Sequence, residues 1–143
     1  MEESIREAFG LVGSDVRSYS PLTLAFLGDA VFELVIRTMI VEKGNQPPKQ
    51  LHLASSKLVK AETQSRMAEL LLPEFTEEEL AVYRRGRNAH PGTTAKHAAT
   101  GDYRRATGLE ALMGYLYLSG QEQRMIALIR QGWEMLCEWK NIP

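Results

Sequence analysis

The most apolar long segment of this chain reads PLTLAFLGDAVFELVIR, residues 21–37. Its apolar residues recur with gaps of one, three and four, which predicts a largely buried helix running from about residue 21 to Lys43. Ser20 can cap this helix, and Pro21 suits its first turn. Gly28 costs roughly 1 kcal/mol of helix stability relative to alanine, so it needs a packing or functional reason. Asp29 must be paired, hydrogen-bonded or bound to a metal, because an isolated buried charge is costly.

A second apolar segment has the same feature. Residues 103–118 read YRRATGLEALMGYLYL, again a helix with one central acid, Glu110. Gly114 follows four residues later and therefore lies beside Glu110 on the same helix face. Glycine allows a backbone or a ligand to approach closely. Two apolar helices thus each carry one carboxylate with a glycine nearby.

These two carboxylates have two interpretations. They can be half-exposed acids, each paired with an arginine such as Arg37 or Arg105, because ion-paired acids on helices are common. Alternatively, the two helices cross and the acids share a divalent cation. The sequence pattern by itself leaves both interpretations open.

The rest of the chain reads as helices joined mostly by short turns. We predict helices over residues 4–13, 49–72, 76–88, 102–119 and 122–139 in addition to the long apolar one. Thr76 and Glu79 form a capping-box pattern at the start of the fourth helix. Residues 89–101 are rich in turn formers and predict an exposed, mobile loop. The predicted class is all-α, a helical bundle of about six helices.

Composition is that of an ordinary soluble domain. The chain has 143 residues, 44% hydrophobic and 24% charged, with a formal net charge of -1. That charge argues against coating nucleic acid by bulk charge, but not against a local basic face. The single cysteine, Cys137, is compatible with a reducing cytoplasm, and neither a signal peptide nor a membrane span is predicted.

Positive charge is concentrated in residues 83–105, which hold six cations against Asp102 alone. Arginine binds phosphate oxygens in a fork, so this window predicts contact with a phosphate backbone. The competing interpretation is a solvated helix end, since cations near a helix C-terminus complement its dipole. The candidate RNA-binding residues are Arg84, Arg85, Arg87, Asn88, Lys96, His97, Arg104 and Arg105.

Other kinds of chemistry fit less well. The sequence has no H-E-x-x-H, no Cys-x-x-Cys and no P-loop motif, and its three histidines lack the spacing of a zinc site. Magnesium needs only one or two protein carboxylates when a phosphate supplies further oxygen ligands. Asp29 and Glu110 are therefore candidate ligands of a magnesium ion.

At these acids the chain resembles a known family. The string FLGDAV at 26–31 is similar to the signature of ribonuclease III, and LEALMG at 109–114 is similar to its second acidic motif. The strings RRGRNA at 84–89 and TGLEALMGYLYL at 107–118 resemble its small branch, Mini-ribonuclease III. The resemblance covers roughly residues 18–130, and the paired motifs at this separation are specific.

The resemblance implies an all-helical endonuclease domain that acts as a homodimer on double-stranded RNA. It implies that Asp29 and Glu110 are catalytic residues and ligands of Mg²⁺. The signature helix would also form the dimer contact, with Phe26, Leu27 and Val31 at the interface.

The chain departs from the family pattern at three positions. Family acids precede the signature aspartate by four and seven residues and the glutamate by three, and here those positions hold Ala25, Leu22 and Thr107. The metal site is expected to be leaner than usual, with water or Thr107 filling in, and a second metal is in doubt. We expect residues 1–143 to form one catalytic domain without a double-stranded-RNA-binding domain.

The branch implies a biological substrate. That substrate is 23S ribosomal RNA precursor, whose ends are matured in the bacterial cytoplasm with a bound ribosomal protein as an aid. The alternative is a ribonuclease III-like fold kept only as an RNA-binding or ribosome-associated structural module. Loss of three family acids favours the module, while retention of Asp29, Glu110 and the arginine cluster opposes it.

Overall fold

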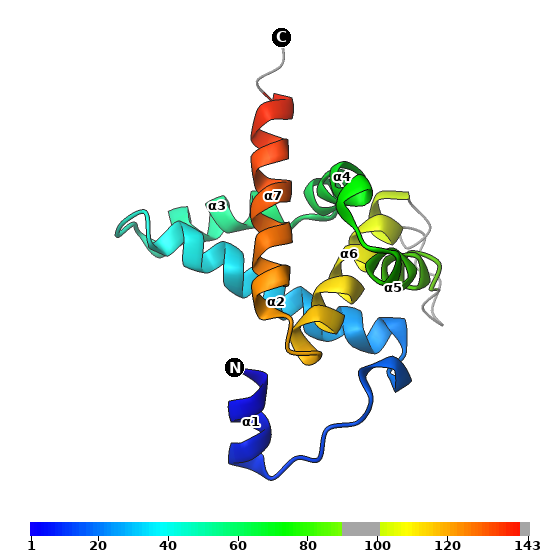
Figure 1. The fold of residues 1–143 in the computed structure, drawn as a ribbon. Helices are drawn as coiled ribbons and strands as arrows, with labels where there is room; N and C mark the ends of the chain where they lie inside the picture. The colour runs from blue at the N-terminus through cyan, green and yellow to red at the C-terminus, as the bar shows by residue number, and fades with distance from the viewer. Residues whose placement is uncertain (90–100, 141–143) are drawn as a thin grey trace.

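The computed structural model describes residues 1–89 and 101–140, and within them every regular element is helical (Figure 1). Two 3-10 turns, η1 (Val16–Ser18) and η2 (Leu72–Glu74), lie between the longer elements. The α-helices of the described residues are α1 (Glu2–Phe9), α2 (Pro21–Val41), α3 (Pro48–Val59), α4 (Ala61–Leu71), α5 (Glu77–Arg87), α6 (Gly101–Leu118) and α7 (Glu122–Lys140). The predicted all-α class is confirmed.

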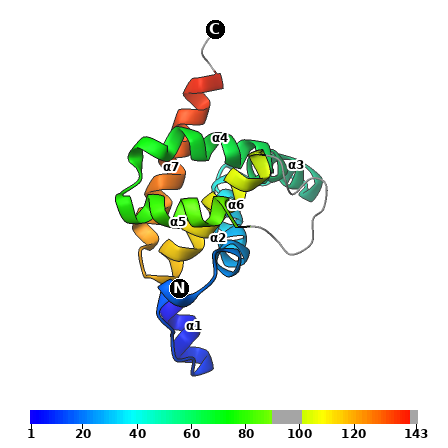
Figure 2. The same ribbon diagram turned by 90° about the vertical axis from the view of Figure 1, so that its right-hand side faces the viewer.

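Helix α6 is the centre of the molecule. It packs against α2 on one side and against α4 and α5 on others, and α7 covers part of α4 (Figures 1 and 2). From Ala106 to Tyr117 every α6 side chain is buried except those of Thr107 and Glu110, which are half-buried. Glu110 is thus the one acid in the buried stretch of α6 from Ala106 to Tyr117, and its position is fixed by core packing.

The crossing of α2 and α6 explains both glycines that the sequence left without a reason. A β-carbon on Gly28 would lie 1.7 Å from the carbonyl oxygen of Glu110. A β-carbon on Gly114 would lie 2.0 Å from the carbonyl oxygen of Leu24. The two backbones therefore touch at a point where no side chain fits. Because Asp29 follows Gly28 directly, this contact sets the spacing of the two acidic positions.

Helix α5 begins at the predicted capping box. The Thr76 hydroxyl accepts a hydrogen bond from the backbone N–H of Glu79, and the Glu79 carboxylate accepts one from the backbone N–H of Thr76. Glu79 is only 4% exposed, and Arg124 of α7 donates two hydrogen bonds of 2.8 Å to its carboxylate. This fork ties α7 to the start of α5 and lowers the pKa of Glu79.

One helix prediction is wrong. Residues 49–72 form two helices, α3 and α4, because Lys60 between them is extended, with φ -68° and ψ 154°. Helix α3 packs on α2 while α4 packs on α6, so the chain must turn between them. The Thr63 hydroxyl donates to the carbonyl oxygen of Lys57 across the break. With this break, the described residues contain seven α-helices where about six were predicted.

The N-terminal helix, α1, begins and ends earlier in the chain than predicted. It was expected at residues 4–13 but ends at Phe9, where Gly10 adopts a φ of 61°. Arg6 donates to the carbonyl oxygen of Leu118, which holds α1 against the turn between α6 and α7. Phe9 is 74% exposed, and in both ribbon views α1 projects from the remaining helices (Figure 2). Among the described residues, no helix is long and apolar enough to cross a membrane.

Candidate active site

Asp29 and Glu110 face the same cleft, as their interpretation as a metal pair requires. The cleft has a volume of about 430 Å³ and opens between α2 and α6. Its lining consists of residues from α2, from the first half of α6 and of Ala89, two residues after the end of α5. These residues are Leu22, Ala25, Phe26, Leu27, Asp29, Ala30, Ala89, Tyr103, Arg104, Thr107 and Glu110.

The environment of Glu110 disfavours its charged form. Burial, followed by a hydrogen bond to Asp29 and the negative charge of Asp29, raises the pKa of Glu110 from 4.5 to about 8. The two carboxyl groups are therefore close enough to interact directly. With its pKa raised to about 8, the Glu110 carboxyl mostly keeps its proton at neutral pH unless a nearby cation favours the charged form.

The alternative interpretation, an arginine partner for each acid, does not hold among the described residues. Arg37 bonds to Glu33 on its own helix, with 3.0 Å between Nη2 and the carboxylate oxygen. Arg105 bonds to Glu69 and Asp102, at 3.2 Å each. Neither arginine is engaged with Asp29 or Glu110, so the two acids have only each other.

The three positions that depart from the family pattern all line this cleft. Leu22 and Ala25 lie on α2 and Thr107 lies on α6, one turn before Glu110. The Thr107 hydroxyl donates a hydrogen bond of 3.0 Å to the carbonyl oxygen of Tyr103. The wall beside the two acids is therefore mostly apolar.

The donor set fits a hard cation that needs few protein ligands. In the part of the chain that the structure describes, no group of three or more His, Cys, Asp or Glu side chains gathers as a metal site. Two carboxylates suffice for Mg²⁺, which keeps several waters and accepts phosphate oxygens. Burial and the neighbouring Asp29 raise the pKa of Glu110, and a cation held by both carboxylates would favour its charged form.

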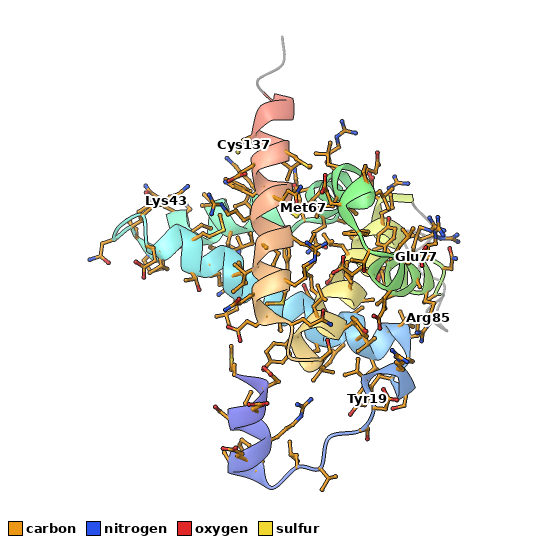
Figure 3. The ribbon with its side chains drawn as sticks, viewed as in Figure 1. Tyr19, Lys43, Met67, Glu77, Arg85 and Cys137 are labelled. Carbon is orange, nitrogen blue, oxygen red and sulfur yellow. The ribbon has the colours of Figure 1, made fainter. Side chains whose placement is uncertain are left out.

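The arginines of α5 lie apart from the acids, in the last turn of that helix. Arg84 and Arg85 are exposed, and Arg87 stacks over the Tyr83 ring at 5.9 Å from its centre. Asn88 is exposed and accepts a hydrogen bond from Arg87. Arg85 lies at the edge of the molecule, and the small pocket it lines also includes Leu24 of α2 (Figure 3).

The two arginines that begin α6 differ from one another. Arg105 is held inside the subunit, since its guanidinium donates to the Ser65 hydroxyl at 2.8 Å and bonds to Asp102. Arg104, in contrast, lines the cleft of the two acids. Lys96 and His97, two other candidate RNA-binding residues, lie outside the described residues.

The three candidate interface residues of α2 have different environments. Phe26 is 82% exposed, which is unusual for so large an apolar side chain, and Leu27 is half-buried. Val31 is only 7% exposed and belongs to the core of the subunit, so it offers little area to a partner. Phe26 and Leu27 both also line the cleft, so the candidate interface lies beside the two acids.

Comparison with known proteins agrees with this geometry. A family model described as Ribonuclease III domain matches residues 22–121, the stretch that holds α2, α6 and both acids. The chain belongs to the ribonuclease III family. A Mini-ribonuclease 3 of Brevibacillus brevis is 46% identical over 117 residues, which cover 82% of this chain and 87% of that relative.

Two further proteins are similar to this chain, one by sequence and one by structure. A Mini-ribonuclease 3 of a Thermoanaerobacter species is 48% identical over 80% of this chain and 81% of its own length. The crystal structure of a Fusobacterium nucleatum protein is 31% identical, with a TM-score of 0.72, and covers 85% of this chain and 98% of its own. The resemblance to the Mini-ribonuclease III branch is thus confirmed.

The predicted site left out an aromatic residue of this ribonuclease III cleft, Tyr103. Tyr103 lines the cleft and is 44% exposed. Tyr103, Thr107 and Glu110 are four and three residues apart, a spacing that places side chains on one helix face. That periodicity would have included Tyr103, had it been counted back from Glu110.

Proposed function

We propose that this protein is a magnesium-dependent endoribonuclease that cleaves double-stranded RNA at the cleft holding Asp29 and Glu110. One observation carries the proposal: α2 and α6 cross at Gly28 and Gly114 and bring two carboxylates, neither with an arginine partner among the described residues, into one cleft. Membership of the ribonuclease III family supports the reaction.

Asp29 and Glu110 are the residues that would hold the magnesium ion. When bound there, the ion supplies Lewis-acid chemistry for phosphodiester hydrolysis, by polarising the phosphate and promoting ionisation of water. Asp29 and Glu110 would hold the ion from two helices whose backbones touch, so the two ligand positions are set by the α2–α6 contact. The apolar lining at Leu22 and Ala25 limits the number of further ligands.

The RNA strand would be held by the basic surface formed by Arg84, Arg85, Arg87 and Asn88 at the end of α5. These side chains carry no acidic partner among the described residues, and arginine binds phosphate oxygens in a fork. Double-stranded RNA is recognised mainly through shape, phosphates and 2′-hydroxyls, which such a surface can contact.

Two subunits would act together, each cutting one strand. The exposed Phe26 and the half-buried Leu27 of α2 are the proposed dimer contacts. Residues 1–143 would form a single catalytic domain. The biological substrate would be 23S ribosomal RNA precursor in the cytoplasm, its ends matured with a bound ribosomal protein as an aid, as the Mini-ribonuclease III branch implies.

The test is the cleavage of a duplex RNA by Asp29→Asn, with and without magnesium. The amide keeps the shape of the side chain but loses the charge that holds the ion, so cleavage should be lost while duplex binding in calcium is retained. The matched control is Glu33→Gln, which removes a carboxylate one turn further along α2, where it pairs with Arg37. This control should cleave like the parent.

Two outcomes would contradict the proposal. If Asp29→Asn cleaves at the parent rate in magnesium, the site is wrongly assigned. If the parent binds duplex RNA but never cleaves it, the protein is the RNA-binding structural module that loss of three family acids favours.

A further inference from the structure

Arg104 occupies a position unlike that of any other cation in the described residues. It follows Tyr103 among the α6 residues that line the active-site cleft, one turn before Thr107 and two before Glu110. No other lysine or arginine of the described residues lines that cleft. The arginines of the basic surface on α5 lie outside it.

The hydrogen bonding of Arg104 is incomplete. Its Nε is fully buried and has no hydrogen-bond partner among the residues that the structure describes. Its neighbour Arg105 uses the Ser65 hydroxyl and the carboxylates of Asp102 and Glu69. Buried guanidinium N–H groups are normally satisfied, and an exception at a cleft calls for an acceptor that is absent from the free protein.

The charges of the cleft suggest which acceptor this is. Its described lining contains two acids, Asp29 and Glu110, and one base, Arg104. Two carboxylates provide ligands for one divalent cation, and the neutral Leu22, Ala25 and Thr107 provide no carboxylate for a second. Hydrolysis of a phosphodiester adds negative charge on the phosphoryl oxygens, and one metal ion leaves part of it for another positive group.

We propose that Arg104 is a catalytic residue that binds the non-bridging oxygens of the scissile phosphate and stabilises the charge that develops there. The inference rests on the proposed function. In the reaction, the oxygen of water bonds to phosphorus as the bond from phosphorus to the 3′ oxygen breaks. The water proton passes to solvent, the 3′ oxygen takes one from solvent, and the products are a 5′-phosphate and a 3′-hydroxyl.

The proposed role of Arg104 affects the rate of cleavage, whereas the basic surface on α5 affects the binding of RNA. A cation that anchors the RNA contributes equally before and during the reaction, so its loss weakens binding and leaves the rate at saturation unchanged. A cation aimed at developing charge contributes mainly in the transition state. Its loss lowers the rate at saturating RNA.

Arg104 should also influence the binding of metal. Its positive charge repels a divalent cation held by Asp29 and Glu110 in the same cleft. Removing that charge should therefore tighten metal binding in the absence of RNA. A residue that merely maintains the fold of the cleft would weaken metal binding when replaced, so the two roles predict opposite signs.

The experiment compares Arg104→Gln and Arg104→Lys with the parent. Three quantities are measured: the single-turnover cleavage rate at saturating duplex RNA in magnesium, duplex affinity in calcium, and Mn²⁺ affinity without RNA by calorimetry. The control is Arg130→Gln, which removes an arginine on α7 that pairs with Glu134. Circular dichroism checks that each variant is folded.

For Arg104→Gln we expect a cleavage rate lower by roughly 100-fold or more, a duplex affinity within about threefold of the parent, and tighter Mn²⁺ binding. Arg104→Lys keeps the positive charge but loses the paired N–H donors of the guanidinium. Its cleavage rate should therefore lie between those of the parent and Arg104→Gln, and its Mn²⁺ affinity should match that of the parent. Arg130→Gln should behave as the parent in all three measurements.

The inference fails if Arg104→Gln cleaves at the parent rate, if its loss of duplex affinity equals its loss of rate, or if Mn²⁺ binding weakens. Should glutamine prevent folding, the same three criteria apply to Arg104→Lys, whose unchanged cleavage rate would overturn it. Failure of the proposed function is separate, because it is decided by whether Asp29→Asn loses cleavage.

Discussion

At the scale of single residues, placing the Glu110 carboxyl in the cleft beside Asp29 costs folding free energy when Glu110 is charged and no cation is bound. Burial and Asp29 raise the pKa of Glu110 from 4.5 to about 8. Between those values the folded protein holds a proton that the unfolded chain has released, so this group's contribution to stability falls as pH rises. The loss of folding stability caused by the position of Glu110 is therefore greatest above neutral pH.

Replacing Glu110 by Gln should remove this cost. With a chelator present, we expect the thermal midpoints of Glu110→Gln and the parent to be similar at about pH 5 and the variant to be more stable at about pH 9. The difference should be on the order of 1–3 kcal/mol after allowance for solvent screening. Differential scanning calorimetry across this range measures it.

The control for that prediction is Glu33→Gln, which changes an acid in an ion pair on α2. It should show no gain as pH rises. A difference between Glu110→Gln and the parent that is the same at both ends of the pH range would mean that Glu110 titrates normally and that the two carboxyl groups are farther apart.

At the scale of elements, the contact between α2 and α6 sets the geometry of the site. Gly28→Ala should destabilise the protein by roughly 3 kcal/mol or more, because its β-carbon would lie 1.7 Å from backbone that cannot move without separating the helices. Chemical denaturation measures the loss. Cleavage should fall as well, since the two acids would move apart.

A glycine on another helix provides the comparison. In Gly132→Ala the new β-carbon would lie 2.5 Å from the Met67 side chain, which is flexible and can shift. This variant should lose less stability than Gly28→Ala and should keep its cleavage activity. Equal losses in the two variants would show that the α2–α6 contact is not specially tight.

Comparing the predicted helices with the observed ones shows which features sequence patterns can predict. Apolar periodicity and caps predicted α2, α5 and α6, and the capping box of Thr76 and Glu79 is present. The break at Lys60 was missed because neither glycine nor proline marks it, and only packing on two different helices makes the chain turn there. Patterns along one helix cannot report such a tertiary requirement.

The same limit applies to the site. Lone acids on apolar helices left two interpretations open, and the resemblance to ribonuclease III favoured the one in which Asp29 and Glu110 meet, as they do in the cleft. The sequence could not separate Arg104 from Arg105, because adjacent arginines look alike until Ser65 and Glu69 engage one and leave the other at the cleft. Residues 90–100, predicted to form a mobile loop, lie outside the described residues.

At the scale of the whole molecule, the exposed Phe26 predicts a two-fold homodimer. In Phe26→Glu a charge would be buried in the interface, so the variant should sediment as a monomer at micromolar concentration where the parent sediments as a dimer. The matched control is Phe9→Glu, which alters a similarly exposed phenylalanine on α1. It should remain dimeric.

A parent protein that sediments as a monomer at that concentration would contradict the dimer, and with it the paired cutting of two strands. A dimer that survives Phe26→Glu but dissociates in Phe9→Glu would place the interface on α1 instead.

The basic surface on α5 also belongs to this scale, because it must supply affinity that a net charge of -1 does not. Replacing Arg84, Arg85 and Arg87 by Ala should weaken duplex binding and flatten its dependence on salt, since fewer counterions are released. Affinity is measured in calcium across a salt series. The control is Arg37→Ala with Arg130→Ala, two arginines engaged with neighbouring glutamates. An unchanged slope in the triple variant would place the RNA elsewhere.

The crossing of α2 and α6 has a consequence for biosynthesis. Asp29 is translated long before Glu110, and the cleft exists only when α6 has emerged and docked on α2, with α4 and α5 between them in the chain. A nascent chain still missing α6 has one acid and no cleft. Nuclease activity should therefore begin only after α6 has been made and has docked on α2, so a nascent chain that ends before α6 should be unable to cleave RNA.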